Sequence, residues 1–419
     1  MKQTIAPVRP AHTAREARYD LRGPLAERAA DLQTRGHDII DLHLGDPAAH
    51  GLNAPDTVLR AAAEGLHRAA AYSDERGLPA AREAIADHYR QAGLVHATAD
   101  RVFLGNGVSE LASLSLQALL DPGDTLLVPA PGYPLWPACA TLTGATAVPY
   151  LCREDTAWAP DPAELAARTG SRTRAIVVIN PGNPTGAHWP PAVLESIVDL
   201  ARRHHLMLLS DEIYAELCYP GTTHVPLAAL APDVPCLTFG GLSKFCRLPG
   251  YRAGWAVASG PRSATADYLQ ALTLLAGLRM CPNVPAQHAI PTALSPDVLA
   301  STRRATAPGG TLTLCRDALH SALTLHPGVR CARPDGAFYT FPRLPLPPAV
   351  DDKAFTRHLL ERHHVLATPG AQFDAPGSTH IRLSALAPPE TLDIAAQRIH
   401  QALGEFAAAE APSAGEQDG

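Results

Sequence analysis

The sequence predicts an α/β protein with a mainly parallel, doubly wound sheet. In the middle of its 419 residues, short apolar runs alternate with segments whose apolar residues repeat at helical spacing. Several of these runs are apolar throughout, as is typical of strands that are buried on both faces. Because strands that alternate with helices usually pair in parallel, this order predicts one sheet with helices on both faces.

Seven runs are candidate strands: Arg101–Leu104, Thr125–Val128, Ala145–Leu151, Arg174–Asn180, Leu206–Ser210, Cys236–Phe239 and Gly254–Ser259. After the first run, Leu111, Leu114 and Ala118 mark the buried face of a helix. Two further packed helices are indicated by apolar residues at i, i+3, i+4 and i+7. These residues are Leu194, Ile197, Val198 and Ala201 in one helix, and Leu392, Ala395, Ala396 and Ile399 in the other.

The composition excludes several classes of protein. Hydrophobic residues make up 46% of the chain and charged residues 18%, which is too apolar for a disordered protein. The net charge of -6 provides no basic field, so we expect no nucleic-acid partner. No apolar run approaches the ~18 residues of a transmembrane helix, and the N-terminus lacks the apolar stretch of a signal peptide. We therefore expect a cytoplasmic protein with no membrane association.

The cysteines point to a reducing compartment. Eight of them lie between Cys139 and Cys331, and no pair has CxxC spacing. In a chain of this size they are expected to be buried free thiols rather than disulfides. The ligand spacing of zinc sites is absent, so we expect no metal site.

Polar and aromatic residues in Gly- and Pro-rich turns follow five of the candidate strands. In doubly wound sheets, ligands bind beyond the carboxyl ends of the strands, so these turns predict a site along one edge. The turns are Gly105–Glu110, Pro129–Pro134, Asn180–Gly186, Asp211–Tyr214 and Gly240–Lys244.

The chain contains only three lysines, Lys2, Lys244 and Lys353, among its 35 basic residues. Arginine cannot form a Schiff base, so a chain poor in lysine still needs one where that chemistry occurs. Lys244 lies at the end of an apolar strand, whereas Lys2 lies in the N-terminal segment and Lys353 in a Pro-rich loop. If a lysine of this chain forms an imine with an aldehyde cofactor, we expect it to be Lys244.

Asp211 and Tyr214 follow a second buried strand. Asp211 is either a helix N-cap or a carboxylate that faces a protonated pyridine nitrogen and keeps a cofactor ring able to accept electrons. Tyr214 is either a core residue or a donor to the phenolate oxygen of the same cofactor.

The Gly105–Glu110 turn leads directly into a predicted helix. Free N–H groups at a helix N-terminus, together with a serine hydroxyl, form a natural phosphate site. The turn matches neither GxGxxG nor the Walker Gly-Lys-Ser/Thr pattern, which argues against a dinucleotide or a P-loop nucleotide.

From about Tyr19 to Phe406, the chain resembles a fold-type I pyridoxal-phosphate (PLP) aminotransferase of the aspartate aminotransferase superfamily. The motifs that carry the resemblance are Asn180–Gly186 (NPGNPTG), Ser210–Tyr214 (SDEIY), Ser243–Trp255 (SKFCRLPGYRAGW), Pro334–Tyr339 (PDGAFY) and His380–Leu383 (HIRL). Their order and spacing together make the resemblance specific.

The resemblance implies a role for each matching residue. Lys244 would hold the cofactor as an imine and move the proton between Cα and C4′, and Asp211 would pair with the pyridine nitrogen. The other cofactor contacts would come from Tyr214 and Asn183 on O3′, Tyr133 on the ring, and Val108, Ser109, Ser243 and Arg252 on the phosphate. Tyr72 is similar to the tyrosine that reaches the phosphate of a partner subunit, which implies a homodimer. Arg382 would clamp the substrate α-carboxylate, and the backbone of Gly45 would close over it.

The family also implies a domain division. Residues 1–50 would form an N-terminal arm and part of a smaller α+β domain built from both chain ends, and residues 51–290 the large PLP-binding domain. Residues 291–406 would complete the small domain, and residues 407–419 would form a disordered tail.

Within the family, the chain is most similar to bacterial alanine-forming glutamate–pyruvate transaminases. The matching segments are Arg18–Pro24 (RYDLRGP), Tyr72–Leu78 (YSDERGL), Gly105–Leu111 (GNGVSEL) and Cys281–Ile290 (CPNVPAQHAI). In that subgroup Tyr19 and Arg22 would help to bind substrate, although an ordinary polar pair on an N-terminal arm is the alternative. Four residues depart from the subgroup pattern, namely Gly240, Cys246, Leu248 and Asp46. They affect which substrate is expected, because substrate specificity depends on contacts of ~1–3 kcal/mol each.

The resemblance thus implies a transaminase that takes alanine and 2-oxoglutarate to pyruvate and glutamate. Another PLP reaction on an amino acid, catalysed by a lyase, oxidase or cyclase, remains the nearest alternative because fold alone does not set the reaction. A ligand-sensing regulator is disfavoured by the negative charge and by the few residues outside the match.

Three other sets of residues have structural interpretations. The pairs His204–His205 and His363–His364 are expected on the surface, and Trp136 is expected to pack in the core. Arg279 is either structural or the partner of a second substrate carboxylate.

Overall fold

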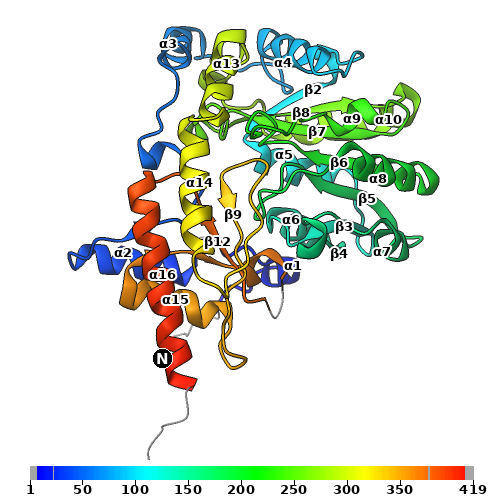
Figure 1. Ribbon diagram of the computed structural model, residues 1–419. Helices are drawn as coiled ribbons and strands as arrows, with labels where there is room; N and C mark the ends of the chain where they lie inside the picture. Colours follow the sequence, from blue (N-terminus) through cyan, green and yellow to red (C-terminus); the bar gives the residue numbers. More distant parts are fainter. Residues whose placement is uncertain (1–6, 22, 376–377, 411–419) are drawn as a thin grey trace, which may run out of the picture.

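In the computed structural model, residues 7–21, 23–375 and 378–410 are described. The largest element is a seven-stranded sheet with the order β2-β8-β7-β6-β5-β3-β4 (Figure 1). Its strands are β2 (Val102–Asn106), β3 (Thr125–Ala130), β4 (Thr146–Leu151), β5 (Thr173–Ile179), β6 (Met207–Asp211), β7 (Cys236–Gly241) and β8 (Ala253–Ser259). All seven correspond to predicted strands, and the prediction of a mainly parallel α/β fold is confirmed.

One strand of this sheet runs against the others. β8 pairs antiparallel with both β2 and β7, whereas the other neighbours pair in parallel. The first residue of β8 therefore lies at the edge where the other strands end. Arg252, which immediately precedes β8, is thereby placed at that edge.

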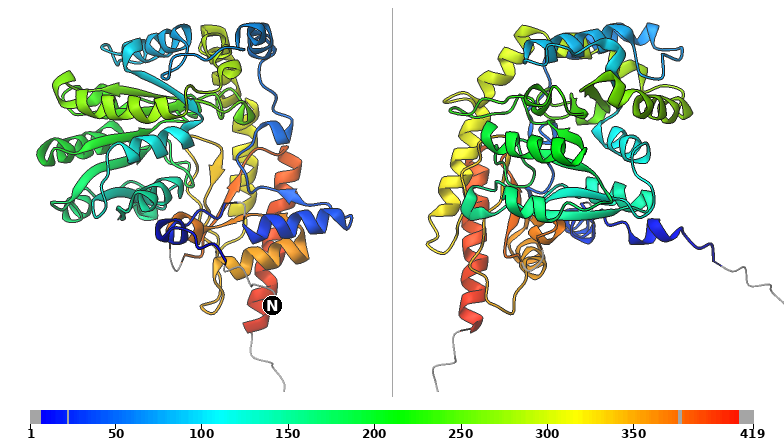
Figure 2. Two further views of the ribbon diagram at one scale, coloured as in Figure 1. Left: turned by 180° about the vertical axis from the view of Figure 1, so that it is seen from behind. Right: turned by 90° about the vertical axis from the view of Figure 1, so that its right-hand side faces the viewer.

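The helices were expected on both faces of the sheet, and they are found there (Figure 2). The α-helices are α1 (His12–Glu16), α2 (Pro24–Thr34), α3 (Asp56–Gly65), α4 (Pro79–Gln91), α5 (Val108–Gln117), α6 (Leu135–Thr143), α7 (Pro162–Ala167), α8 (Pro191–His204), α9 (Leu227–Leu230), α10 (Arg262–Leu278), α11 (Val284–Gln287), α12 (Ile290–Ala293), α13 (Pro296–Thr306), α14 (Thr311–Thr324), α15 (Asp352–His363) and α16 (Pro389–Glu410). Proline at the first position starts several of them, including α4 and α8, where its fixed φ suits the helix and its missing N–H costs nothing.

Side chains that alternate along each strand pack into two hydrophobic cores, one on each face of the sheet. On one face, Phe103, Val177 and Phe239 pack under α5, α6 and α10. On the other face, Leu104 and Val178 pack under α4, α7, α8 and α9. The predicted buried faces of α8 and α16 are confirmed, since all eight of their pattern residues are buried.

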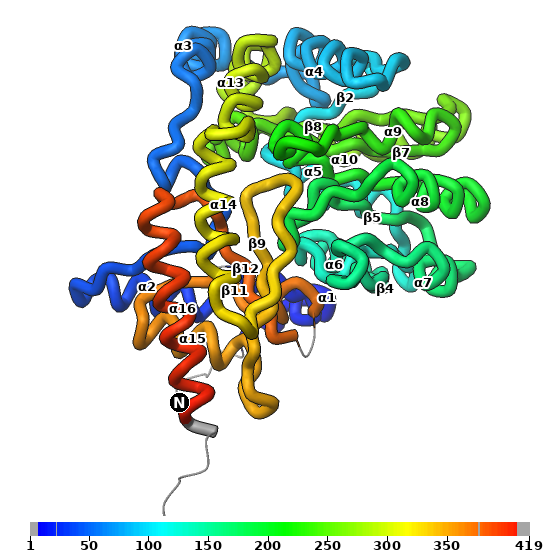
Figure 3. Tube along the Cα trace, in the orientation of Figure 1, coloured from blue at the N-terminus to red at the C-terminus, as the bar shows by residue number. Residues whose placement is uncertain are grey.

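The smaller part of the molecule joins the two ends of the chain. β1 (Ile40–Asp41) pairs in parallel with β10 (Val365–Leu366). A second small sheet has the order β11-β12-β9, from β9 (Tyr339–Thr340), β11 (Thr368–Pro369) and β12 (Ile381–Ser384). Helices α14, α15 and α16 share one core with β10 and β12. The N-terminal α2 lies beside α15, although the two are more than 300 residues apart (Figure 3).

The last helix runs further than expected. α16 continues to Glu410, so residues 407–410 are helical rather than part of a disordered tail. Residues 411–419 lie outside the described residues.

All eight cysteines are free and most are buried, as predicted. Among the helices of the described segments, none is long and apolar enough to cross a membrane.

Candidate active site

A cavity of about 670 Å³ lies at the carboxyl edge of the large sheet, between that sheet and the small one. The structure brings twelve of the predicted site residues to its walls: Tyr19, Gly45, Val108, Ser109, Tyr133, Asn183, Asp211, Tyr214, Ser243, Lys244, Arg252 and Arg382. Two predicted residues are not among them. Tyr72 is 76% exposed and lies away from the cavity, and Arg22 lies outside the described residues.

Lys244 follows the end of β7 and points across the cavity. Its Nζ donates a hydrogen bond to the backbone oxygen of Gly45 at 2.8 Å. The side chain is half-buried, which keeps its amine accessible to a ligand in the cavity. Lys2 lies outside the described residues, and Lys353 is exposed on α15. Of the two lysines that the structure describes, Lys244 is therefore the one in a position to react.

Asp211 is the last residue of β6 and is almost completely buried. Burial raises the pKa of its carboxyl to about 6, although a hydrogen bond from Trp136 Nε1 to Oδ2 at 3.3 Å acts in the opposite direction. A buried carboxylate with this one side-chain donor is poorly compensated. It is suited to a cationic ligand group in the cavity that it lines.

Trp136 is more than the packing residue that the sequence predicted. Its ring does pack, edge to face, against Phe239 with centroids 5.2 Å apart. However, its indole N–H also orients Asp211. The packing prediction was correct and incomplete, because a hydrogen bond to a residue 75 positions away leaves no local pattern in the sequence.

Tyr339 is a site residue that the sequence reasoning did not single out. Its hydroxyl accepts a hydrogen bond from Tyr214 at 3.2 Å. Burial acts to raise the pKa of Tyr339, but the positive charges of Lys244 and Arg382 and the Tyr214 hydrogen bond outweigh it, so the pKa is lowered. Burial raises the pKa of Tyr214 well above its usual value. The Pro334–Tyr339 motif was the available signal for Tyr339.

An anion site is formed where α5 begins. Gly107 precedes this helix with a φ of +83°, and no side chain caps the first N–H groups of the helix. Arg252 lies beside this turn, and its guanidinium donates to the backbone oxygens of Pro249 and Asn106. The partial positive charge of the helix, the Ser109 hydroxyl and Arg252 together suit a phosphate.

Glu110 in the first turn of α5 does not oppose this anion site. Its carboxylate accepts hydrogen bonds from the backbone and side chain of Asn106 and lies 3.3 Å from Arg279 Nη1. Arg279 also donates to the backbone oxygen of Leu104. Arg279 thus neutralises Glu110 and is not a lining residue of the cavity, which favours its structural interpretation.

Arg382 on β12 forms the opposite wall and is 2% exposed. Its Nη1 donates to Asn183 Oδ1 at 3.1 Å, and its Nη2 donates to the backbone oxygen of His43 at 2.5 Å. Among the described residues, none provides a hydrogen-bond partner for its Nε. Because an arginine binds a carboxylate through two parallel N–H groups, this guanidinium has capacity left for an acidic ligand group.

The last wall comes from the N-terminal segment. The hydroxyls of Tyr19 and Tyr133 are 2.7 Å apart, and their rings meet edge to face. Tyr19 is 48% exposed, so it closes the cavity from the solvent side.

Together these groups fit pyridoxal phosphate. The cavity offers a lysine for an aldehyde, a poorly compensated buried carboxylate for a pyridinium nitrogen, and an uncapped helix N-terminus with an arginine for a phosphate. A mainly parallel α/β sheet with these groups at its carboxyl edge defines the class of PLP-dependent enzymes.

The chain belongs to the aminotransferase class I and II family, whose model matches residues 37–399. It is 46% identical over 383 residues to the alanine aminotransferase of Mycobacterium tuberculosis, covering 90% of this chain and 88% of that protein. It is 39% identical to the glutamate–pyruvate aminotransferase of Escherichia coli, covering 96% and 99%.

Solved structures agree with this assignment. A crystal structure of an aminotransferase from Escherichia coli matches with a TM-score of 0.93 and 39% identity, covering 96% of this chain and 99% of that one. The alanine aminotransferase from Pyrococcus furiosus matches with a TM-score of 0.89 and 33% identity, covering 95% and 100%. The predicted family, fold, enzyme class and cofactor are confirmed.

Proposed function

We propose that this transaminase exchanges the amino group between alanine and 2-oxoglutarate, giving pyruvate and glutamate. The similarity to an alanine aminotransferase and a glutamate–pyruvate aminotransferase carries the choice of substrates, and the positions of Lys244 and Arg382 in the cavity support an α-amino acid. Arg382 donates to the backbone oxygen of His43 and Lys244 to that of Gly45. Residues two apart are separated by no more than about 7 Å even in a fully extended chain. This short span suits an α-amino acid whose α-carboxylate meets Arg382 while its Cα faces Lys244.

The names of the relatives support the same substrates. The Mycobacterium tuberculosis relative is an alanine aminotransferase and the Escherichia coli relative a glutamate–pyruvate aminotransferase. The first match covers 90% of this chain and the second covers 96%.

In the proposed mechanism, the Arg382 guanidinium binds the substrate α-carboxylate. Lys244 Nζ then takes the proton from Cα and delivers it to C4′, and in the second half of the reaction it would move a proton in the reverse direction. When bound, pyridoxal phosphate supplies an electron-accepting ring that stabilises negative charge developing at Cα. Asp211 holds the proton on the pyridine nitrogen of this ring, and Trp136 orients the Asp211 carboxylate.

The remaining residues position the reacting groups. We assign the phosphate to the Val108 and Ser109 turn, Ser243 and Arg252, and the ring face to Tyr133. Asn183 accepts from Arg382 through Oδ1, which leaves its Nδ2 to donate to O3′ together with the Tyr214 hydroxyl. Gly45 holds the Lys244 amine through its backbone oxygen, while Tyr19 and Arg22 cover the substrate.

We also infer a homodimeric, cytoplasmic enzyme. Tyr72 is exposed and lies away from its own cavity, which suits a residue that completes the phosphate site of a second copy. The free thiols suit a reducing compartment. We keep the division into an arm and partial small domain (1–50), a large domain (51–290) and the rest of the small domain (291–406), which the pairing of β1 with β10 supports.

A half-reaction with the PLP-loaded enzyme tests the substrate proposal. Single amino acids are added without any 2-oxo acid, and the absorbance of the cofactor is followed. We expect alanine and glutamate to convert the cofactor to its amine form faster than aspartate or tyrosine, with recovery on adding pyruvate or 2-oxoglutarate. Product formed without the amine form of the cofactor would instead indicate a lyase or an oxidase.

A further inference from the structure

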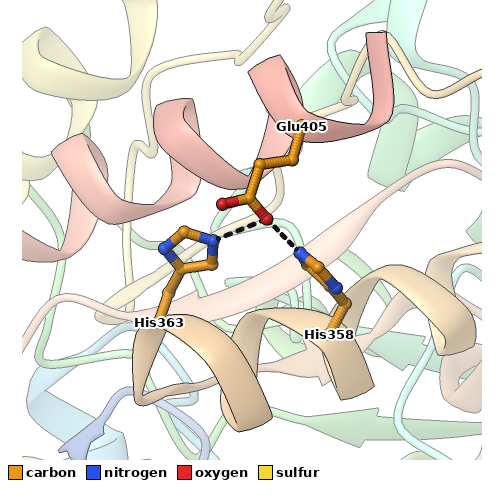
Figure 4. Close-up of side chains that lie close together, drawn as sticks. All are labelled: His358, His363 and Glu405. Atoms are coloured by element: carbon orange, nitrogen blue, oxygen red, sulfur yellow. Dashed lines mark hydrogen bonds and ion pairs between the residues drawn. The ribbon is translucent and has the colours of Figure 1, made fainter. Parts of the chain in front are cut away.

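A second cluster of reactive side chains lies far from the cavity, where α15 packs against α16. It consists of His358 and His363 on α15 and Glu405 on α16 (Figure 4). The sequence predicts His363 as a surface residue, which is wrong, because its side chain is only 10% exposed. The proposed transamination uses none of the three residues.

The two imidazoles point at the same atom. His358 Nε2 lies 2.6 Å and His363 Nε2 3.2 Å from Glu405 Oε2, and all three ligand atoms lie within 4.8 Å of one another. The ligand atoms of a tetrahedral Zn²⁺ with bonds of about 2.0–2.2 Å are about 3.3–3.6 Å apart. Small side-chain rotations would therefore place all three atoms around one ion.

The cluster is built into the helix packing rather than formed by mobile surface residues. Phe406 packs edge to face on His358 with centroids 4.9 Å apart, and it also contacts Phe355. His363 is fixed at the last position of α15, where its backbone oxygen accepts a hydrogen bond from Arg398 on α16. The C-terminal turn of a helix also carries partial negative charge, which favours a cation.

One buried atom of the cluster is poorly satisfied. His363 Nε2 has almost no exposed surface, and although it lies 3.2 Å from Glu405, it has no hydrogen bond of acceptable geometry. A buried polar atom usually finds a partner. This nitrogen is aimed at the oxygen that a shared ion would also contact.

We propose that His358, His363 and Glu405 bind a Zn²⁺ ion that fastens α16 to α15. Two imidazoles and one carboxylate select a transition metal over Mg²⁺ or Ca²⁺, and the open fourth position is filled by water because Glu405 is 49% exposed. The expected absence of a metal site rested on cysteine spacing. A site whose ligands lie on two helices, with Glu405 42 or more residues after the histidines, escapes such a search.

The alternative is a purely hydrogen-bonded cluster, in which both Nε2 atoms carry protons and donate to Glu405. Metal binding requires a lone pair on each Nε2, so the two arrangements exclude one another. The proposal is tested by whether Zn²⁺ binds there and displaces these protons.

The test uses the PLP-loaded enzyme after treatment with a chelator and removal of free cofactor. Zn²⁺ is titrated by calorimetry, and we expect one ion per chain. Glu405→Gln, which keeps the size of an exposed side chain, and His363→Ala are each expected to lower the affinity at least 10-fold. Loss of a residue that merely orients a ligand already costs about 10- to 100-fold.

His326→Ala is the matched control, because His326 also faces a second histidine, His400, with ring centroids 5.3 Å apart. We expect it to bind Zn²⁺ like the parent enzyme. Co²⁺ in place of Zn²⁺ is expected to show visible bands without thiolate absorption, which separates this site from the free cysteines. Absence of Zn²⁺ binding, unchanged affinity in Glu405→Gln, or thiolate absorption with Co²⁺ would overturn the proposal.

Discussion

The cofactor side and the substrate side of the cavity are built from different kinds of chain segment. Asp211 and Lys244 follow neighbouring strands of the large sheet, and Val108 begins the helix after β2. Arg382 and Tyr19, in contrast, come from a short antiparallel strand and an N-terminal segment more than 300 residues apart. Asp211 is 4% exposed, whereas Tyr19 is half exposed.

This difference indicates which side of the cavity is held more rigidly. Strand ends in a sheet with two cores are fixed by packing on both faces, so the groups that hold a cofactor keep their positions. On the other side, Arg382 is held by a buried strand of the small domain, whereas Tyr19 comes from an exposed segment, which suits a residue that admits and releases substrates. Substitutions on the cofactor side should therefore affect every substrate alike, and those on the substrate side should change the ranking of substrates.

Replacement of Lys244 should have the largest effect. Lys244→Ala removes the proposed group that both binds the cofactor and transfers the proton, so we expect kcat for every amino donor to fall by roughly 10⁴-fold or more. Steady-state rates with alanine and with glutamate measure this. Lys353→Ala, at an exposed lysine of α15, is the control and should keep full activity. A fall limited to one donor would contradict a common cofactor role.

Asp211→Asn should have the next largest effect. Without a carboxylate opposite the pyridine nitrogen, we expect kcat to fall about 10²- to 10³-fold, as when one preorganised electrostatic partner is removed. Because the change lies on the cofactor side, the ratio of rates for alanine and glutamate should not move. Trp136→Phe, which removes the hydrogen bond to Asp211 together with part of a buried ring, should give a smaller fall of the same kind.

The same substitution should stabilise the cofactor-free protein at neutral pH. In the folded state Asp211 keeps its proton up to a pH of about 6, because burial raises its pKa from 3.8. The folded protein thus binds more protons than the unfolded chain, and stability falls as the pH rises through this window, by roughly 3 kcal/mol in all. Asp211→Asn removes this pH-dependent loss of folding stability, because the amide does not titrate. Thermal unfolding of both cofactor-free proteins should show the variant gaining roughly 3 kcal/mol at pH 8 and about half as much at pH 5, where the unfolded carboxyl is already ionised.

The cofactor side was also the predictable side. Buried strands could be read from apolar runs, and parallel strands end at one edge, so the residues after those strands had to meet there. Asp211, Tyr214 and Lys244 were found by this reasoning before any resemblance was used. The substrate side has no such rule, because the segments that carry Arg382, Gly45 and Tyr19 meet only after the small sheet joins the two chain ends.

The direction of a strand was another feature that the sequence could not predict. The apolar run at Gly254–Ser259 predicts a strand but not that β8 runs antiparallel, and only that direction places Arg252 at the ligand edge. Arg252 was assigned by resemblance alone. Trp136 and Tyr339 show the same limit at the level of side chains, since their contacts in the site join residues far apart in sequence.

Arg382→Lys tests whether Arg382 acts on the substrate rather than on the cofactor. A lysine keeps the positive charge but loses the two-pronged contact with a carboxylate, so we expect a loss of about 1.5–3 kcal/mol, or roughly 10- to 150-fold in kcat/KM. Cofactor affinity should be unchanged. Equilibrium binding of PLP and the kcat/KM for alanine measure the two effects, and a large fall in PLP affinity would show that Arg382 supports the cofactor side instead.

Tyr19→Phe should have the smallest effect and the most dependence on substrate. It removes one hydroxyl contact, 2.7 Å long, between the two sides of the cavity, and a typical hydrogen bond contributes about 0.5–1.5 kcal/mol, or roughly 2- to 10-fold in kcat/KM. Tyr133→Phe removes the same contact from the cofactor side. If the hydroxyls act as a pair, the double variant should lose no more than either single one. Additive losses in that cycle would mean that Tyr19 acts on the substrate directly, and that the substrate side is independent of the cofactor side even where they touch.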